Sequence, residues 1–280
     1  MKRIVIFLIA NTVSVVGWCQ NPWNKSKGES FIKLDQTIII SDAFYTPEKT
    51  IKDITTTGVY ITSLYAEYGF TNKITGILYL PFFFRSTLNE QEFTQSGTTE
   101  PGDALNSIGD ATVGFQYQIL KRDNFSLSSS LMLGIPIGDD MGGDTQLLQS
   151  GDGEFNQLVK IHGGYSFYPK PVYLAVGFGF NNRTRGFSDE FHVSFEAGYT
   201  FNEKLNVALK FYNLSSLRNG DISASQTGLF SNNLEFFSFG PEVSYQVTER
   251  FGLSGSVFGA FSGRNILASP SFSLGAFLKL

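Results

Sequence analysis

The stretch that decides the fold is residues 192–214, HVSFEAGYTFNEKLNVALKFYNL. Apolar side chains alternate with polar or small ones from Val193 to Phe201, and the alternation resumes at Leu205 after the polar stretch 202–204. A repeat of two residues is typical of a β-strand with one apolar and one polar face, and a short polar interruption indicates a turn. The stretch therefore predicts a β-hairpin. The class of protein then depends on whether the apolar face contacts a protein core or lipid.

The composition narrows the possible partners. Charged residues make up 16% of the 280 residues, well below the ~25% typical of soluble domains, whereas aromatic residues make up 15%. The net charge of −4 offers no basic surface to a nucleic acid, so we expect no nucleic-acid partner. A single cysteine excludes an internal disulfide framework.

The N-terminus has the features of a secretory signal peptide. Lys2 and Arg3 precede a mostly apolar run over residues 4–16 that ends in small residues. The run is too short to cross a bilayer as a helix, so we expect a signal peptide over residues 1–20 and one domain over residues 21–280. Lipid attachment at Cys19 is an alternative, although Trp18 stands where a lipobox has Gly or Ala. No later apolar run reaches ~18 residues, so an exported chain of this kind enters a membrane only as strands.

Alternation and turn residues predict about twelve strands. They are expected near residues 29–40, 56–70, 74–85, 107–120, 125–136, 153–168, 172–182, 187–201, 205–214, 234–248, 251–262 and 270–280.

The predicted connections alternate in length. Short ones lie at 71–73, 121–124, 169–171, 202–204 and 248–250, and long polar ones at 41–55, 86–106, 137–152, 216–232 and 263–269. Only 183–186 is short where a long connection is expected. Tight turns at one end and long loops at the other are typical of outer-membrane barrels.

The two faces of the strands favour a barrel in lipid over the alternative, a secreted β-sandwich. Lipid cannot form hydrogen bonds with the unpaired peptide groups of an open sheet edge, so strands that span a membrane must close into a ring. Aromatic side chains near strand ends are expected to form interfacial girdles: Tyr60, Tyr68, Phe70, Tyr117, Tyr165, Tyr199, Phe201 and Tyr245. The last strand alternates up to Leu280, which resembles the signal read by the barrel-assembly machinery. The predicted fold is all-β: a transmembrane antiparallel up-and-down β-barrel of about twelve strands in the outer membrane of a Gram-negative bacterium.

Two motifs carry a family resemblance. Residues 107–120, SIGDATVGFQYQIL, and residues 133–140, LGIPIGDD, resemble paired motifs of the outer-membrane barrels associated with meta-pathway phenol degradation. The stretches at 172–180 and 195–205 also fit, whereas Ser107 replaces the first Gly of the first motif. The family resembles, more distantly, the fatty-acid and aromatic-hydrocarbon channels of the outer membrane. The resemblance implies passage of small, often hydrophobic molecules across the outer membrane, and it does not imply a catalytic site. We expect no cofactor.

Charged side chains on the polar faces are the candidates for a pathway through the lumen. They are Lys33, Asp35, Glu67, Arg85, Asp110, Glu154, Lys160, His162, Glu196, Lys210 and Glu242. Both signs are present, and buried charges are costly unless paired. The same residues can therefore be a selectivity ring or a set of ion pairs that fills the barrel.

Three further features have a chemical and a structural interpretation. His192 and Ser194 lie two residues apart on one face, the spacing of a nucleophile–base pair in an outer-membrane lipid hydrolase, but they fall on the polar face. The acidic loop 137–154 can be a calcium site or a solvated loop, and we favour the loop. LPFFFRS at 80–86 can be a hydrophobic entry patch or part of a girdle, and we favour the girdle.

The sequence thus favours a channel for passive uptake of small hydrophobic or amphiphilic solutes. The alternatives are a non-conducting barrel with a plugged lumen that binds a partner, and the lipid hydrolase. The expected partners are outer-membrane lipid, the barrel-assembly machinery and a small-molecule solute.

Overall fold

The computed structural model describes residues 22–93, 98–221 and 228–280. The expected signal peptide over residues 1–20, with Cys19, lies outside the described residues. Among the described residues, no helix is long and apolar enough to cross a membrane.

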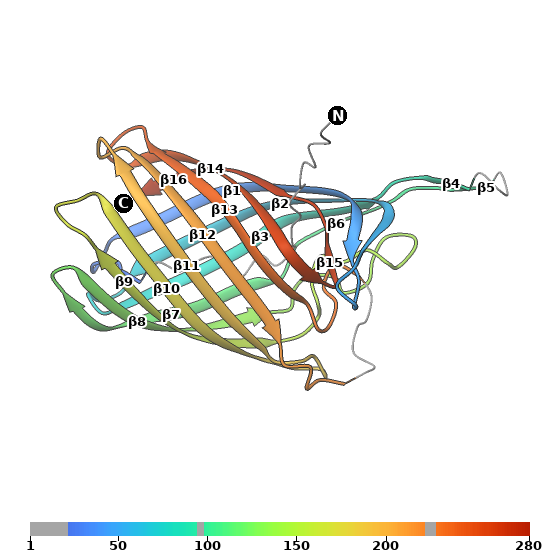
Figure 1. Ribbon diagram of the computed structural model, residues 1–280, viewed down its shortest axis with the longest axis horizontal. Coiled ribbons are helices and arrows are strands. Elements are labelled where there is room, and N and C mark those ends of the chain that lie inside the picture. Colours follow the sequence, from blue (N-terminus) through green and yellow to red (C-terminus); the bar gives the residue numbers. More distant parts are fainter. Residues whose placement is uncertain (1–21, 94–97, 222–227) are drawn as a thin grey trace, which may run out of the picture.

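Twelve long strands of the described chain form one closed antiparallel barrel (Figure 1). They are β1 (Ser30–Tyr45), β2 (Ile51–Gly69), β3 (Ile74–Leu88), β7 (Ala111–Arg122), β8 (Phe125–Ile135), β9 (Asn156–Ser166), β10 (Val172–Arg183), β11 (Glu190–Phe201), β12 (Leu205–Ser216), β13 (Glu235–Gln246), β14 (Phe251–Arg264) and β16 (Ser271–Lys279). Each pairs with its neighbour along the chain, and β1 pairs with both β2 and β16, which closes the ring. The predicted all-β barrel of about twelve strands is confirmed.

Four short strands lie at the long-loop end. β4 (Gln91–Phe93) and β5 (Thr98–Glu100) form a hairpin that projects beyond the barrel (Figure 1). β6 (Asp103–Ser107) extends the wall beside β3, and β15 (Ile266–Leu267) pairs with the end of β1. The prediction of a long polar loop over 41–55 is wrong, because β1 and β2 continue as a paired ribbon and leave only residues 46–50 as the turn.

The strand predicted over 107–120 is interrupted. β6 ends at Ser107 and β7 begins at Ala111, with Gly109 donating its N–H to the carbonyl of Pro81 on β3 at 2.8 Å. A Cβ at position 109 would lie 2.7 Å from the Pro81 ring, so only glycine fits this close approach. The motif that carries the family resemblance therefore spans the break between β6 and β7 rather than a continuous strand.

A bulge in β3 changes which face its last residues occupy. Thr62 of β2 pairs with Phe83 and Leu64 pairs with Leu80, so two residues of β3 lie opposite one residue of β2. The extra residue reverses the alternation, so Phe84 points into the barrel and Arg85 points out.

Two predictions for this strand are corrected as a result. Arg85, predicted to face the lumen, instead bonds Asn106 of β6 at 2.7 Å on the outer side of the wall. The stretch at 80–86 divides: Phe82 and Phe83 are exposed, as a girdle requires, whereas Phe84 is 1% exposed and lies inside.

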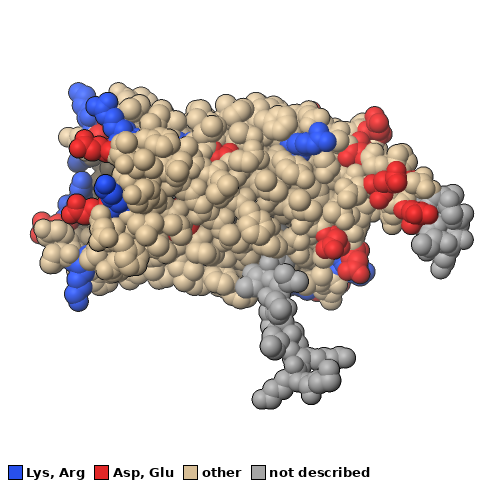
Figure 2. All heavy atoms as spheres, turned by 90° about the horizontal axis from the view of Figure 1, so that it is seen from above, with Lys and Arg blue, Asp and Glu red and all other residues tan. Residues whose placement is uncertain are grey.

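The outer surface is apolar along the strands. Figure 2 shows a broad band with few charges between one end rich in Lys and Arg and an opposite end rich in Asp and Glu. Girdle residues at the short-turn end are exposed and their rings contact in pairs: Tyr68 meets Phe70 edge-on, and Tyr199 meets Phe201 at a tilt. The predicted division into an apolar outer face and a polar inner face is confirmed.

We expect an arginine on the outer face to destabilise the barrel according to its depth. Phe178, 61% exposed near the middle of β10, should cost about 2–4 kcal/mol of unfolding free energy when replaced by Arg, against ~0–1 kcal/mol for Phe201→Arg at the end of β11. Denaturant titration in lipid vesicles measures both values. Equal costs at the two positions would show that the middle of β10 is not in hydrocarbon.

Candidate functional site: the barrel lumen

Two cavities in the lumen are lined by residues that the structure describes. The larger, about 620 Å³, lies toward the short-turn end, and the smaller, about 110 Å³, lies toward the long loops. Tyr79 lines both of them, so its side chain lies between the two.

The larger cavity brings together six of the predicted lumen residues. They are Lys33, Asp35, Glu67, Glu196, Lys210 and Glu242. Lys33 contacts Asp35 at 2.9 Å, and Lys210 contacts Glu242 at 2.9 Å and Glu196 at 3.7 Å. Four carboxylates and two lysines are in this set, and Lys25 and Lys279, which also line the cavity, bring the lysines to four. The charges of the wall therefore balance, as expected for charges in a narrow lumen.

Two tyrosines complete this wall. Tyr65 donates to Glu67 and Tyr173 donates to Glu196, each at 2.6 Å. These hydroxyls hold the carboxylates against the wall, and the tyrosine rings add apolar surface beside the charged groups.

The segment over residues 22–28 lies inside the barrel mouth at the short-turn end. Lys25 pairs with Glu67 at 3.0 Å, and Trp23 contacts the ring of Tyr173 edge-on at 5.8 Å. Ser126 of β8 donates to the carbonyl of Pro22 at 2.7 Å. The segment thus bonds or packs against β2, β8 and β10 and narrows the opening of the larger cavity.

Glycine makes room for this segment. A Cβ at Gly164 of β9 would clash with Pro22 and Trp23, and a Cβ at Gly69 of β2 would clash with the carbonyl of Ser26. The inner wall is therefore shaped to receive residues 22–28.

Between the two cavities the barrel is filled by side chains. Ile77, Met132 and Leu158 form a buried apolar cluster. Lys160 and His162, both predicted lumen residues, are each 1% exposed; Lys160 lies over the ring of Tyr212 and His162 bonds Ser130. They lie inside the barrel, as predicted, but in its packed middle.

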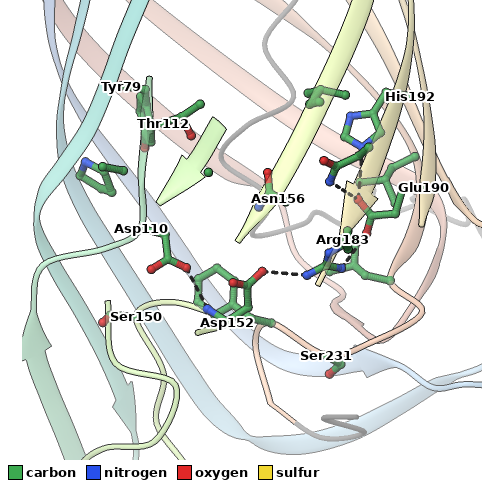
Figure 3. Close-up of a pocket in the computed structure, with 18 of the residues that line it drawn as sticks. Tyr79, Asp110, Thr112, Ser150, Asp152, Asn156, Arg183, Glu190, His192 and Ser231 are labelled. Atoms are coloured by element: carbon green, nitrogen blue, oxygen red, sulfur yellow. Dashed lines mark hydrogen bonds and ion pairs between the residues drawn. The ribbon is translucent and has the colours of Figure 1, made fainter. Parts of the chain in front are cut away.

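The smaller cavity is built around one arginine (Figure 3). Arg183, at the end of β10, donates to Glu154 at 2.6 Å, to Asp152 at 2.7 Å and to Glu190 at 2.8 Å. These carboxylates come from the β8–β9 loop and from β11, so the guanidinium ties that loop to the wall. Arg183 is largely buried, and each of its three nitrogens is engaged.

A second acidic group faces this cluster. The Asp110 carboxylate accepts hydrogen bonds from the backbone of Gly138 at 2.8 Å and of Asp152 at 2.9 Å (Figure 3). Burial raises the pKa of Asp152, which lies in the loop, to about 6; Arg183 opposes this shift and the Asp110 carboxylate adds to it. Asp110 and Glu154, both predicted lumen residues, therefore fix the loop over the cavity.

The opposite wall of the smaller cavity is apolar. Phe84 of β3 lies 5.9 Å from Phe230, ring centre to ring centre, and Leu234 and Leu214 line the same cavity. Leu229 and Phe230, from the β12–β13 loop, pack against apolar side chains inside the barrel. The loop residues 228–234 thus cover the lumen at the long-loop end.

The chemical interpretations of the other motifs find little support. His192 directs one ring nitrogen to Tyr212 and the other, at 3.2 Å, to Glu190, so neither serves Ser194. In the part of the chain that the structure describes, no group of three or more His, Cys, Asp or Glu side chains is placed to hold a metal ion.

Sequence reasoning missed several residues of the two cavities. Arg183 pairs with Glu190 nearby in the sequence, but its other partners, Asp152 and Glu154, come from a different loop, and no local pattern marks that contact. Tyr212 and Asn181 are on the inward faces of their strands, so the alternation contains a signal for both. Phe230 and Trp23 lie in segments without periodicity, and no such signal marks them.

Comparisons with known proteins agree with the fold. The family model described as "Putative MetA-pathway of phenol degradation" matches residues 40–275. The crystal structure of the COG4313 outer membrane channel from Pseudomonas putida F1 is 14% identical, with a TM-score of 0.69, and the alignment covers 93% of this chain and 98% of that one. A KdgM porin is 8% identical, with a TM-score of 0.50, covering 89% and 99%. No curated protein matches the sequence.

Titration of Asp152 tests the electrostatics of the smaller cavity. With ¹³C-labelled aspartate, its carboxyl should titrate near pH 6, against ~3.9 for an exposed aspartate, and Asp110→Asn should lower that midpoint because it removes a negative neighbour. Since the folded-state pKa lies above the unfolded one, the stability contributed by this group is present at low pH and is lost as the pH rises through 6. A midpoint that does not move in Asp110→Asn would contradict the coupling.

Proposed function

This chain belongs to the MetA-pathway phenol-degradation family, and we propose that it is a passive outer-membrane channel for small hydrophobic or amphiphilic solutes. The observation that carries the proposal is the pair of lumen cavities, each with an apolar wall beside a polar one, inside a barrel whose outer face is apolar. Such a surface suits a molecule that is partly greasy and partly hydrogen-bonding. The fold of the COG4313 channel is compatible with this assignment.

The charge pattern of the larger cavity supports uncharged solutes. Its carboxylates and lysines neutralise one another at 2.9–4.0 Å, so the wall has little net field to draw in either sign of ion. A free ion would also have to leave water for a chamber partly lined by Trp23, Tyr65 and Tyr173.

Flux into asymmetric vesicles with lipopolysaccharide in the outer leaflet tests the proposal. The barrel should speed the entry of toluene above that of protein-free vesicles, and should not speed the entry of glucose or chloride to the same extent. Equal rates with and without the protein would overturn the channel proposal. That result would favour the non-conducting barrel, whose best support is the coverage of the lumen by residues 22–28 at one end and 228–234 at the other.

Passage through the short-turn end requires residues 22–28 to move aside, which gives a matched pair of variants. Lys25→Ala removes the ion pair with Glu67, worth up to about 1 kcal/mol for a part-exposed pair, so the displaced form should rise by up to about fivefold. Lys27→Ala changes an exposed residue of the same segment and is the control.

Fluorescence reports the displacement. In a chain beginning at residue 21, Trp23 is the sole tryptophan, and its quenching by acrylamide should increase in Lys25→Ala but not in Lys27→Ala. Toluene flux should rise with the quenching. Increased quenching without any change in flux would show that the segment does not limit passage.

A further inference from the structure

Three basic side chains share one carboxylate at the long-loop end of the barrel. Glu235, the first residue of β13, contacts Lys49 of the β1–β2 turn and Arg218 of the β12–β13 loop, each at 2.7 Å. Arg264, the last residue of β14, approaches the same carboxylate only to 3.8 Å, which is beyond hydrogen-bond distance. Segments far apart in the sequence thus place three positive charges around one negative charge, and we call these four residues the rim cluster.

The rim cluster lies on the outer face of the wall. Glu235 is opposite Arg264, and two residues further along each strand Phe237 is opposite Ser262. Residues two apart on a strand share a face, and Phe237 is exposed, whereas its neighbour Phe236 is buried in a core cluster inside the barrel. The charges of the cluster therefore stand at the outer rim and not in the lumen.

The cluster has an excess of positive charge that is open to its surroundings. The side chains of Lys49 and Arg218 are 49% and 52% exposed, whereas the Glu235 side chain between them is 10% exposed. Glu48 and Lys52 lie beside the cluster and add one charge of each sign. Four cations against two carboxylates leave two positive charges, at an end of the barrel that Figure 2 shows to be rich in Asp and Glu. An anionic group is the natural partner of such a site.

An aromatic surface continues from the rim cluster toward the middle of the wall. The rings of Phe211, Phe237, Phe239 and Phe261 stack with their centres 4.5–6.4 Å apart. Phe237 lies two residues from Glu235, about 7 Å along the strand. A basic group at the end of an apolar, membrane-facing surface matches an amphiphile with an anionic head and hydrocarbon chains.

The position of the site in the membrane indicates which amphiphile this is. The long loops of outer-membrane barrels lie on the extracellular side, so the rim cluster stands at the level of the outer leaflet. The anionic amphiphile of that leaflet is lipopolysaccharide, whose lipid A part carries phosphates on a disaccharide and several acyl chains. A phosphate monoester has a charge of about −1.5 to −2 at neutral pH, which offsets the excess charge of the cluster.

We propose that the rim cluster and the stacked phenylalanines form a binding site for lipopolysaccharide. Lys49 and Arg218 bind a lipid A phosphate, and the rings of Phe237 and Phe261 contact the acyl chains. Glu235 is a positioning residue, because it holds the two exposed cations side by side. The site is on the outside of the barrel, so it does not depend on the proposed channel function.

Native mass spectrometry of the purified, detergent-folded protein tests the proposal. EDTA is present, because it removes divalent cations that bridge lipid A to acidic loops. Diphosphoryl lipid A should bind at least about tenfold more tightly than phosphatidylethanolamine, which has no net charge to meet the cluster. Equal affinities for the two lipids, or binding of lipid A only when Mg²⁺ is restored, would overturn the proposal. Pyrophosphate that binds as tightly as lipid A would show a site for free phosphate and would overturn the assignment to a lipid.

Charge variants locate the phosphate. Each cation at a membrane surface contributes about fivefold to the affinity for an anionic lipid, so Arg218→Gln should weaken lipid A binding about fivefold and the double variant with Lys49→Gln about 25-fold. Arg185→Gln removes an exposed cation from the β10–β11 turn at the same end and is the control, with an unchanged affinity. Equal losses in Arg218→Gln and Arg185→Gln would show a diffuse attraction and refute the site. If the double variant does not fold, the lipid comparison on the wild type still decides the proposal.

A second pair of variants locates the acyl chains. Phe261→Ala should weaken lipid A binding about threefold, because it removes apolar contact beside the cluster. Phe178→Ala removes a ring of similar exposure from β10 and should leave the affinity unchanged. Equal effects of the two substitutions would show that the stacked phenylalanines form no part of the site.

Discussion

The constraint on which the rest of the structure depends is that lipid offers no hydrogen bond to a peptide group. The twelve strands satisfy their peptide groups through hydrogen bonds between neighbouring strands. The sheet has no free edge, because β1 pairs with β16 as well as with β2. Closure determines which way the side chains of each strand point. Along a strand, alternate residues face hydrocarbon and the residues between them face the lumen. The apolar outer rows and the paired charges inside are therefore two results of the same closure.

The lumen shows how a narrow barrel accommodates charge. In the larger cavity the four carboxylates of the wall each contact a lysine, and two of them also accept from tyrosines. In the smaller cavity one guanidinium contacts three carboxylates. A channel built in this way selects by size and by hydrogen bonding more than by charge, which suits solutes that carry no charge.

The sequence predicts those parts of the structure that follow from regular alternation. The hairpin over 192–214 is formed as β11 and β12, with Glu196 opposite Lys210 on the inner face. Arg85 was misplaced because a bulge at β3 adds a residue that no periodicity reveals, and one added residue reverses every later side chain. The break between β6 and β7 at Gly109 and the position of the loop with Asp152 and Glu154 were not predicted, because the contacts that fix them join distant segments. Residues 22–28 carry no repeat at all, so their place in the lumen could be found only from the three-dimensional structure.

The position of residues 22–28 has a consequence for assembly. Their partners include Ser126, 104 positions from Pro22, and Gln116, 92 positions from Asn24, and these partners lie on the inner wall of a ring that the last strand completes. Contacts across such long stretches of chain repay their loop-closure entropy only when the wall already exists. Residues 22–28 therefore reach their final contacts only after the last strand has closed the barrel. Closure of the wall and docking of this N-terminal segment belong to a single, late step in folding.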